Sequence, residues 1–262
     1  MRYAQVGFVV AISILLGLAL HLDSSAYLEL SLILTVAFQL LIHRQALRGV
    51  WVRTMPPFRL DWQSTLVAAI LAIVPVYTIY LALQKQLWTD LMYGIVSVGG
   101  AVAAAYALRQ MTRRTLRQLL LCLATAGVIG IAINVLFTVV PSIYRHEMVN
   151  FNLGVGLFSF FQYVPALFVM EEVLFRGAFD GYLYEQEKGN SWLSMLYISA
   201  LWGLWHIPVY GTTPQIILVL LLVQIAVGIP LSYWMRKSGN LIVPATAHAL
   251  NDAVRNALGA IP

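Results

Sequence analysis

Charged residues are scarce in this sequence. Only 10% of its 262 residues are Asp, Glu, Lys or Arg, whereas 60% are hydrophobic. Ordinary soluble domains carry about 25% charged residues, so water is excluded as the main solvent of the folded chain. Cysteine is rarer still, because Cys122 stands alone inside an apolar stretch. A disulfide framework and a cysteine metal cluster are thereby excluded.

The apolar residues form long continuous blocks. A helix needs about 20 apolar residues to cross a hydrocarbon core roughly 30 Å thick, which matches the length of these blocks. Strands of a membrane barrel would instead alternate apolar and polar residues over about 10 positions. The blocks cover residues 5–21, 26–43, 66–84, 91–108, 118–140, 155–175, 191–210, 214–235 and 240–258.

We therefore predict an all-α fold, a polytopic transmembrane helical bundle with eight or nine membrane helices. No soluble domain is evident, so residues 1–262 form a single integral membrane domain. Within it, residues 1–150 supply N-terminal transmembrane helices. Residues 151–262 form the helical core that carries the polar motifs described below.

The basic residues indicate the orientation of the bundle. If every block crosses once, only Lys85, Arg145 and Arg255 fall on one side of the membrane, and the positive-inside rule makes the opposite side cytoplasmic. The net charge of +5 thus reports topology, and we predict no nucleic-acid partner. Short loops and the lack of a targeting extension favour a prokaryotic plasma membrane. The cytoplasmic side would hold Arg2, Arg44, Arg48, Arg53, Arg59, Arg109, Arg113, Arg114, Arg117, Arg176, Lys188, Arg236 and Lys237.

Ionisable side chains inside the blocks are the functional candidates, because each costs about 2.5–3.5 kcal/mol to insert into a membrane. One group lies in the segment MEEVLFRG. Glu172 and Arg176 are four residues apart and can form an ion pair on one helix face. Glu171 points about 100° away from that face. Its carboxylate can therefore face a cavity and act as a general base.

Two histidines stand on further helices among apolar residues, His206 in WGLWHIPVY and His248 in PATAHALNDAV. Together with Glu171 they can bind a divalent metal, or they can hold and deprotonate a water molecule. Hydrolysis is the natural chemistry of both arrangements. Asp252 follows His248 by one helical turn, and Asn251 lies within the same turn, so either side chain can reach the pocket.

Glu171 and His206 must lie at the same depth for this chemistry. The block boundaries place Glu171 toward the cytoplasmic end of the sixth helix and His206 toward the outer end of the seventh. We therefore expect the sixth helix to run from about residue 161 to 184. We also expect the seventh helix to be tilted or to start late.

These three motifs, in this order, resemble those of the CPBP intramembrane proteases, also called the Abi or CAAX-protease family. The resemblance covers roughly residues 160–256. Two positions depart from the family pattern: Trp202 stands where phenylalanine is usual, and Asp252 stands where the eukaryotic CAAX endopeptidases have asparagine. The matching residues are Glu171, Glu172, Arg176, Trp202, His206, His248 and Asp252.

The resemblance implies that Glu171 and His206 activate the attacking water, while His248 and Asp252 bind a metal or stabilise the oxyanion. It leaves zinc, held by Glu171, His206 and His248, and a metal-free mechanism both open. Charge favours a metal, since ionised Asp252 would repel Glu171 and a cation would neutralise both. The supporting residues would be Glu172, Arg176, Asn251 and Trp202.

The resulting prediction is an intramembrane endopeptidase that hydrolyses a peptide bond of a membrane-associated protein. Its substrate would be a CAAX-like tail, a leader or a C-terminal sorting segment in the lipid bilayer. One alternative is a catalytically silent membrane scaffold or a bacteriocin-immunity-type binding protein that uses the same cavity. Another is a proton- or metal-coupled transporter, although the sequence lacks the repeated halves that are usual in transporters.

Overall fold

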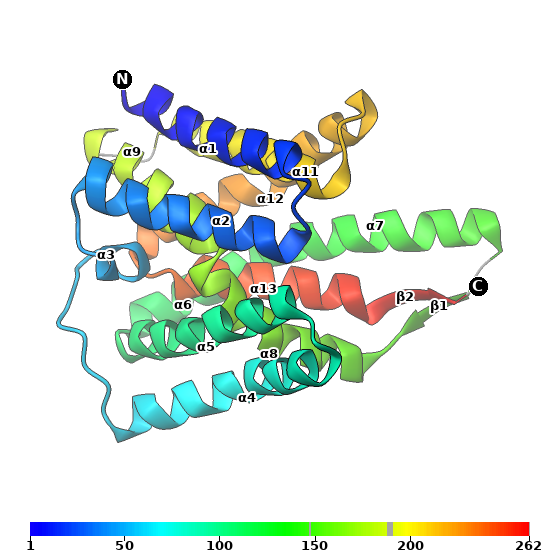
Figure 1. Cartoon of the computed structure of the whole chain (residues 1–262), viewed down its shortest axis with the longest axis horizontal. Helices are drawn as coiled ribbons and strands as arrows, with labels where there is room; N and C mark the ends of the chain where they lie inside the picture. The colour runs from blue at the N-terminus through cyan, green and yellow to red at the C-terminus, as the bar shows by residue number, and fades with distance from the viewer. Residues whose placement is uncertain (147, 188–190, 262) are drawn as a thin grey trace.

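The computed structural model describes residues 1–146, 148–187 and 191–261, which fold into one bundle of long helices (Figure 1). The first helices are α1 (Arg2–Ala19), α2 (Ser24–Ala37) with the π-helical turn η1 (Phe38–His43), α3 (Arg48–Trp51), α4 (Trp62–Lys85) and α5 (Trp88–Arg109). Then come α6 (Arg113–Cys122), η2 (Leu123–Gly127), α7 (Val128–Arg145), α8 (Leu153–Val169), η3 (Val173–Phe179) and α9 (Asp180–Glu187). The last helices are α10 (Trp192–Trp205), α11 (Ile207–Tyr210), α12 (Pro214–Ser238) and α13 (Ile242–Ala257).

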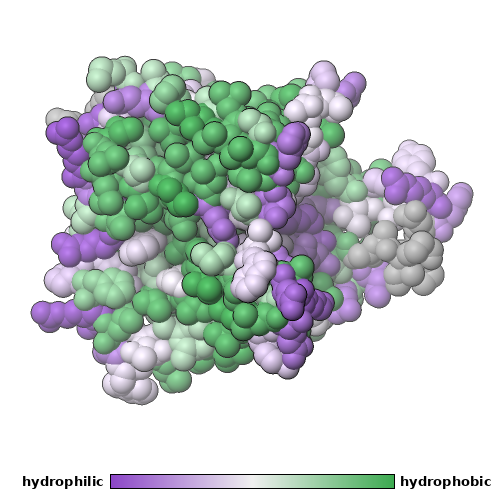
Figure 2. Space-filling view, viewed as in Figure 1, coloured by the Kyte–Doolittle hydropathy of each residue, from purple (hydrophilic) through white to green (hydrophobic). Residues whose placement is uncertain are grey.

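The prediction of a polytopic transmembrane helical bundle is confirmed. Within the described ranges, 7 helices are long and apolar enough to cross a membrane when α2 with η1, α6 with α7, and α8 with α9 are each taken as continuous. Two predicted blocks form shorter helices: α10 has 14 residues and α13 has 16. Candidate His248 lies in α13, and candidate His206 directly follows α10. Figure 2 shows apolar side chains over the middle of the visible face and hydrophilic ones toward its two ends.

The sixth predicted helix differs in its bounds from the expected 161–184. It begins earlier, at Leu153, and continues as η3 and α9 to Glu187. Its α-helical geometry breaks at Met170, where φ is −107° and ψ is −86°. The π-helical turn that follows is of a kind often found at functional sites. This long element places Glu171 near its centre. Glu171 therefore does not lie toward the cytoplasmic end of its helix, where the predicted block boundaries had placed it.

Helices α5 and α8 pack closely because a glycine lies between them. A Cβ atom on Gly100 would collide with the carbonyl oxygen of Pro165 in α8. Small residues of α5 next to Gly100 are also buried, with Ala101 and Ala104 at 0% exposure. Small residues at such a contact let two helix backbones approach each other in a membrane.

The basic loops meet at one end of the bundle, near α3, α6 and α9 (Figure 1). The backbone N–H of Arg53 donates to the carbonyl oxygen of Gly239 at 2.9 Å. The side chain of Gln118 donates to the carbonyl oxygen of Lys237 at 3.0 Å. Asp61, which caps α4, lies at this end, and the hydrogen bonds from Ser64 lower the pKa of its carboxyl group.

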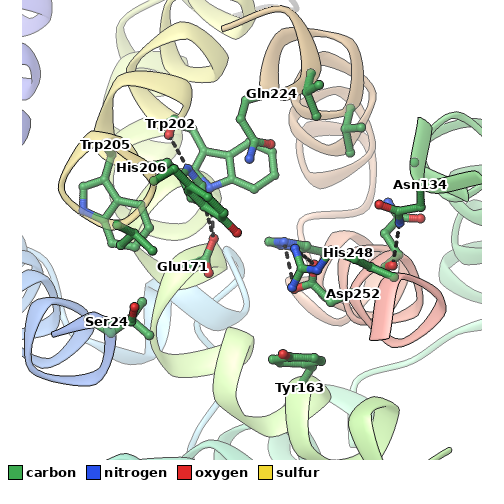
Figure 3. Close-up of a pocket in the computed structure, with 18 of the residues that line it drawn as sticks. Ser24, Asn134, Tyr163, Glu171, Trp202, Trp205, His206, Gln224, His248 and Asp252 are labelled. Carbon is green, nitrogen blue, oxygen red and sulfur yellow. Dashed lines mark hydrogen bonds and ion pairs between the residues drawn. The ribbon is translucent and has the colours of Figure 1, made fainter. Parts of the chain in front are cut away.

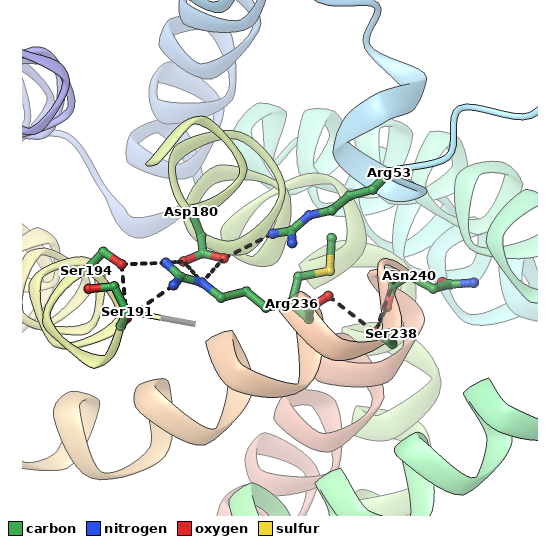
Figure 4. Close-up of polar contacts among 8 residues, drawn as sticks. Arg53, Asp180, Ser191, Ser194, Arg236, Ser238 and Asn240 are labelled. Atoms are coloured by element: carbon green, nitrogen blue, oxygen red, sulfur yellow. Dashed lines mark hydrogen bonds and ion pairs between the residues drawn. The ribbon is translucent and has the colours of Figure 1, made fainter. Parts of the chain in front are cut away.

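A buried ion network holds this basic end together (Figure 4). Arg236 donates to Asp180 from Nε at 3.0 Å and from Nη2 at 2.7 Å. Arg53 donates to the same carboxylate from Nη2 at 3.1 Å. Asp180 is fully buried. The network therefore ties the loop before α4, the sixth helix and α12 to one another.

A two-stranded antiparallel sheet was not expected. Strand β1 (Met148–Phe151) pairs with β2 (Leu258–Ile261) at the end of the molecule opposite the basic loops (Figure 1). Each strand has only 4 residues, too few for the sequence to show an alternating pattern.

Candidate active site

A cavity of about 350 Å³ lies inside the bundle and is lined by side chains of all three motifs (Figure 3). The four predicted catalytic residues line it together: Glu171, His206, His248 and Asp252. They come from three separate helices. In Figure 3, Glu171 and His206 lie on one side of the cavity, with His248 and Asp252 across from them.

The carboxylate of Glu171 faces His206. Glu171 Oε2 accepts a hydrogen bond from Trp202 Nε1 at 3.0 Å, and it lies 3.7 Å from His206 Nε2. His206 stands where α10 ends and α11 begins, and its Nδ1 lies 2.8 Å from the carbonyl oxygen of Trp202. A carbonyl can only accept, so Nδ1 carries the proton in neutral His206 and Nε2 is left as an acceptor. A water molecule between the two acceptors can donate one hydrogen to each.

The second histidine is held by the other glutamate. His248 Nδ1 lies 2.9 Å from Glu172 Oε1. Arg176 Nη1 lies 3.4 Å from the same oxygen, which confirms the predicted ion pair four residues along the helix. The Arg176 guanidinium also stacks over the Trp202 ring at 4.0 Å. Since Glu172 and Arg176 are both fully buried, they orient His248 from behind and do not line the cavity.

Asp252 faces the remaining nitrogen of His248. Its Oδ2 lies 3.6 Å from His248 Nε2, and its Oδ1 lies 2.9 Å from Arg255 Nη1. The sequence reasoning did not assign Arg255 to the site, although its spacing of three residues from Asp252 on a helix was a usable signal. Arg255 supplies a positive charge at the place where the sequence argument called for a metal ion.

Asn251 lies at the edge of the cavity and turns toward η2 and α7. Its Nδ2 donates to the carbonyl oxygen of Ala126 at 3.3 Å. A Cβ atom on Gly130 would collide with the Asn251 amide group, so this glycine makes room for it. Of the two neighbouring side chains, Asp252 is therefore the one beside His248.

The N-terminal half of the chain also lines the cavity, which the sequence reasoning missed. Ser24 of α2, Tyr93 of α5 and Asn134 of α7 contribute to its wall, as does Gln224 of α12. Asn134 Nδ2 donates to the carbonyl oxygen of Asn251 at 2.7 Å. Single polar residues such as Asn134 and Gln224 within apolar blocks were the available signal.

The expected metal ligands are not assembled as a metal site. Among the described residues, no three His, Cys, Asp or Glu side chains are grouped so that they could hold an ion. His206 Nε2 faces Glu171, whereas His248 Nε2 faces Asp252 on the other side of the cavity. The three donors predicted for zinc, Glu171, His206 and His248, therefore do not fit one ion in this arrangement, and we derive no catalytic step through a metal.

Comparison with known proteins bears on the same part of the chain. Residues 153–254 match the model of a family described as type II CAAX prenyl endopeptidase Rce1-like. The match begins with α8 and ends within α13, so it contains all three motifs. It confirms the resemblance to the CAAX-protease family. No curated protein and no solved structure matches the chain.

Proposed function

Taking the match to the Rce1-like endopeptidases as the premise, we propose that this integral, multi-pass membrane protein is an intramembrane endopeptidase. The observation that carries the proposal is the pair formed by Glu171 and His206. Two hydrogen-bond acceptors lie 3.7 Å apart in a cavity within a helical bundle. Such a pair can bind a water molecule through both of its hydrogens and remove one of them.

The proposed reaction begins with that water molecule. Glu171 takes a proton from the water, and the water oxygen attacks the carbonyl carbon of the scissile peptide bond. The new C–O bond forms, and the electrons of the carbonyl double bond move to its oxygen. The C–N bond then breaks as the oxyanion reforms the carbonyl. Glu171 returns its proton to the departing nitrogen, which leaves a carboxylic acid and an amine.

His248 is assigned to the oxyanion. Glu172 Oε1 lies 2.9 Å from His248 Nδ1 and accepts its hydrogen. This contact directs His248 Nε2 toward the cavity. When the ring carries both protons, Nε2–H can donate to the developing negative oxygen. Asp252, 3.6 Å from Nε2, is placed to orient this proton, and Arg255 balances the charge of Asp252.

The substrate class follows from the surroundings of the site. The cavity lies among membrane-spanning helices, so the substrate is a membrane-associated polypeptide in the lipid bilayer. A CAAX-like tail, a leader and a C-terminal sorting segment all satisfy this requirement, and the fold alone does not choose among them. The short loops between the long helices support a prokaryotic plasma membrane as the location.

The test compares the termini of membrane proteins in host cells that carry the wild type, Glu171→Gln or Glu185→Gln. In Glu171→Gln the amide keeps the shape of the carboxylate but cannot act as a base. Glu185 is a matched control, because its exposed carboxylate lies outside the cavity and contacts His43 and Gln45. We expect discrete cleavage products to vanish only with Glu171→Gln. Unchanged termini, with full complementation of a null strain by Glu171→Gln, would replace the protease by the scaffold alternative.

A further inference from the structure

The cavity lies in the half of the bundle that is remote from the basic loops. On α2, which runs toward the basic end, the lining residue Ser24 is the first of the helix. On α13, which runs away from the basic end, the lining residue Arg255 comes late. It follows Ile242 by about 20 Å at 1.5 Å per residue. Tyr210, the last residue of α11, lines the cavity at the same far end.

Exposure increases toward that far end. His206, His248 and Asp252 are only 6–8% exposed. Tyr210 is 51% exposed and the Arg255 side chain 45%. The mouth of the cavity is therefore marked by residues in the terminal turns of their helices.

The opposite direction is filled by buried side chains. Glu172 lies behind the cavity, and Phe175, Phe179 and Asp180 follow it along the sixth helix, all at 0% exposure. Asp180 is part of the network with Arg236 that joins the basic loops (Figure 4). In the part of the chain that the structure describes, packed aromatic rings and ion pairs separate the catalytic groups from the basic end.

We propose that the cavity takes its substrate from the side of the membrane opposite the basic loops, which the positive-inside rule makes the extracytoplasmic side. This inference rests on the proposed peptidase function and narrows its substrate class. The substrate is a segment of a membrane-anchored polypeptide that emerges on the extracytoplasmic surface. A polypeptide tail confined to the cytoplasm would meet the closed end of the bundle.

The first experiment measures the side from which the cavity is reached. Cys122 is fully buried and can be replaced by alanine, so that single cysteines can be placed elsewhere. Ser24→Cys reports on the mouth, Tyr163→Cys on the cavity wall, and Arg114→Cys on the basic end. A membrane-impermeant maleimide should label Ser24→Cys and Tyr163→Cys in intact cells, and Arg114→Cys only in inverted membrane vesicles. Reaction of Tyr163→Cys only from the side that labels Arg114→Cys would overturn the inference.

The second experiment locates the cleavage sites that depend on Glu171. The inference expects them in extracytoplasmic segments next to a membrane anchor, and sites in cytoplasmic tails would contradict it. The two proposals can fail separately. If no cleavage depends on Glu171, the peptidase proposal fails whatever the labelling pattern. If cleavage does depend on Glu171 but maps to cytoplasmic tails, only the proposed side of access fails.

Discussion

Trp202 donates a hydrogen bond from its indole Nε1 to Glu171 Oε2 at 3.0 Å. The same ring lies under the guanidinium of Arg176 at 4.0 Å and meets the ring of His248 edge-on, with centroids 5.0 Å apart. Trp202 belongs to the second motif, and its side chain thus contacts residues of both the first and the last motif. The phenylalanine that is usual at this position in the CAAX-protease family would preserve the packing, but it has no N–H to donate.

We expect Trp202→Phe to slow cleavage with little loss of stability. Without the indole N–H, the Glu171 carboxylate loses a donor that fixes its orientation toward His206. A hydrogen bond to a charged group contributes about 1.5–3 kcal/mol, which corresponds to a rate reduction of roughly 13- to 160-fold. The measurement is the cleavage rate of purified protein in liposomes, with the unfolding temperature as control. An unchanged rate would show that the contact is only structural.

Glu172→Gln should destabilise the protein far more than Glu171→Gln does. Glu172 is the fully buried partner of both Arg176 and His248, so its loss leaves the Arg176 charge uncompensated. Removing one member of a buried pair typically costs about 3–5 kcal/mol. The readout is the unfolding temperature in detergent for both single variants.

The double variant Glu172→Gln, Arg176→Met tests the reason for that loss. It removes both buried charges and should recover part of the lost stability, because no uncompensated buried charge is then left. Equal stability of Glu171→Gln and Glu172→Gln would contradict the assignment of Glu172 to a structural role.

The sequence allowed the three motifs and their grouping to be predicted, because an ionisable side chain in a membrane helix is costly and needs partners. The ion pair of Glu172 with Arg176 followed directly from helical spacing. What spacing does not reveal is where two helices touch. The contact of Glu172 with His248 joins residues far apart in the chain.

Depth within the membrane was the weakest sequence inference. Hydropathy marks an apolar block but gives no sign of a break such as the one at Met170, nor of a helix that continues through charged residues. Asp180 is fully buried because Arg236 and Arg53 neutralise it from two other segments. Such compensation depends on tertiary contacts.

Gly100→Ala should disrupt the packing of α5 against α8, whereas Gly99→Ala should not. A methyl group on Gly100 would meet backbone, the carbonyl oxygen of Pro165, which cannot move aside as a side chain can. Gly99 has nothing within 4 Å of its Cβ position, so a methyl group there has free space.

The expected result is a clear loss of folded protein for Gly100→Ala, measured as unfolding temperature and as yield in detergent. Gly99→Ala should be neutral or slightly stabilising, since alanine is favoured over glycine in a helix by about 0.5–1 kcal/mol. A similar loss in both variants would mean that helix geometry, and not the contact with Pro165, is responsible.

Arg255 provides the final prediction, which concerns the metal. Ionised Asp252 would repel Glu171 unless a positive charge lay nearby, and the Arg255 guanidinium lies 2.9 Å from Asp252. If Arg255 supplies that charge, Arg255→Gln should lower the cleavage rate at least about tenfold, equivalent to ~1.4 kcal/mol. Purified wild type should also keep its activity after treatment with a zinc chelator. Should the chelator abolish activity and added zinc restore it, while Arg255→Gln has no effect, then a metal ion neutralises the carboxylates and the cavity must rearrange to bind it.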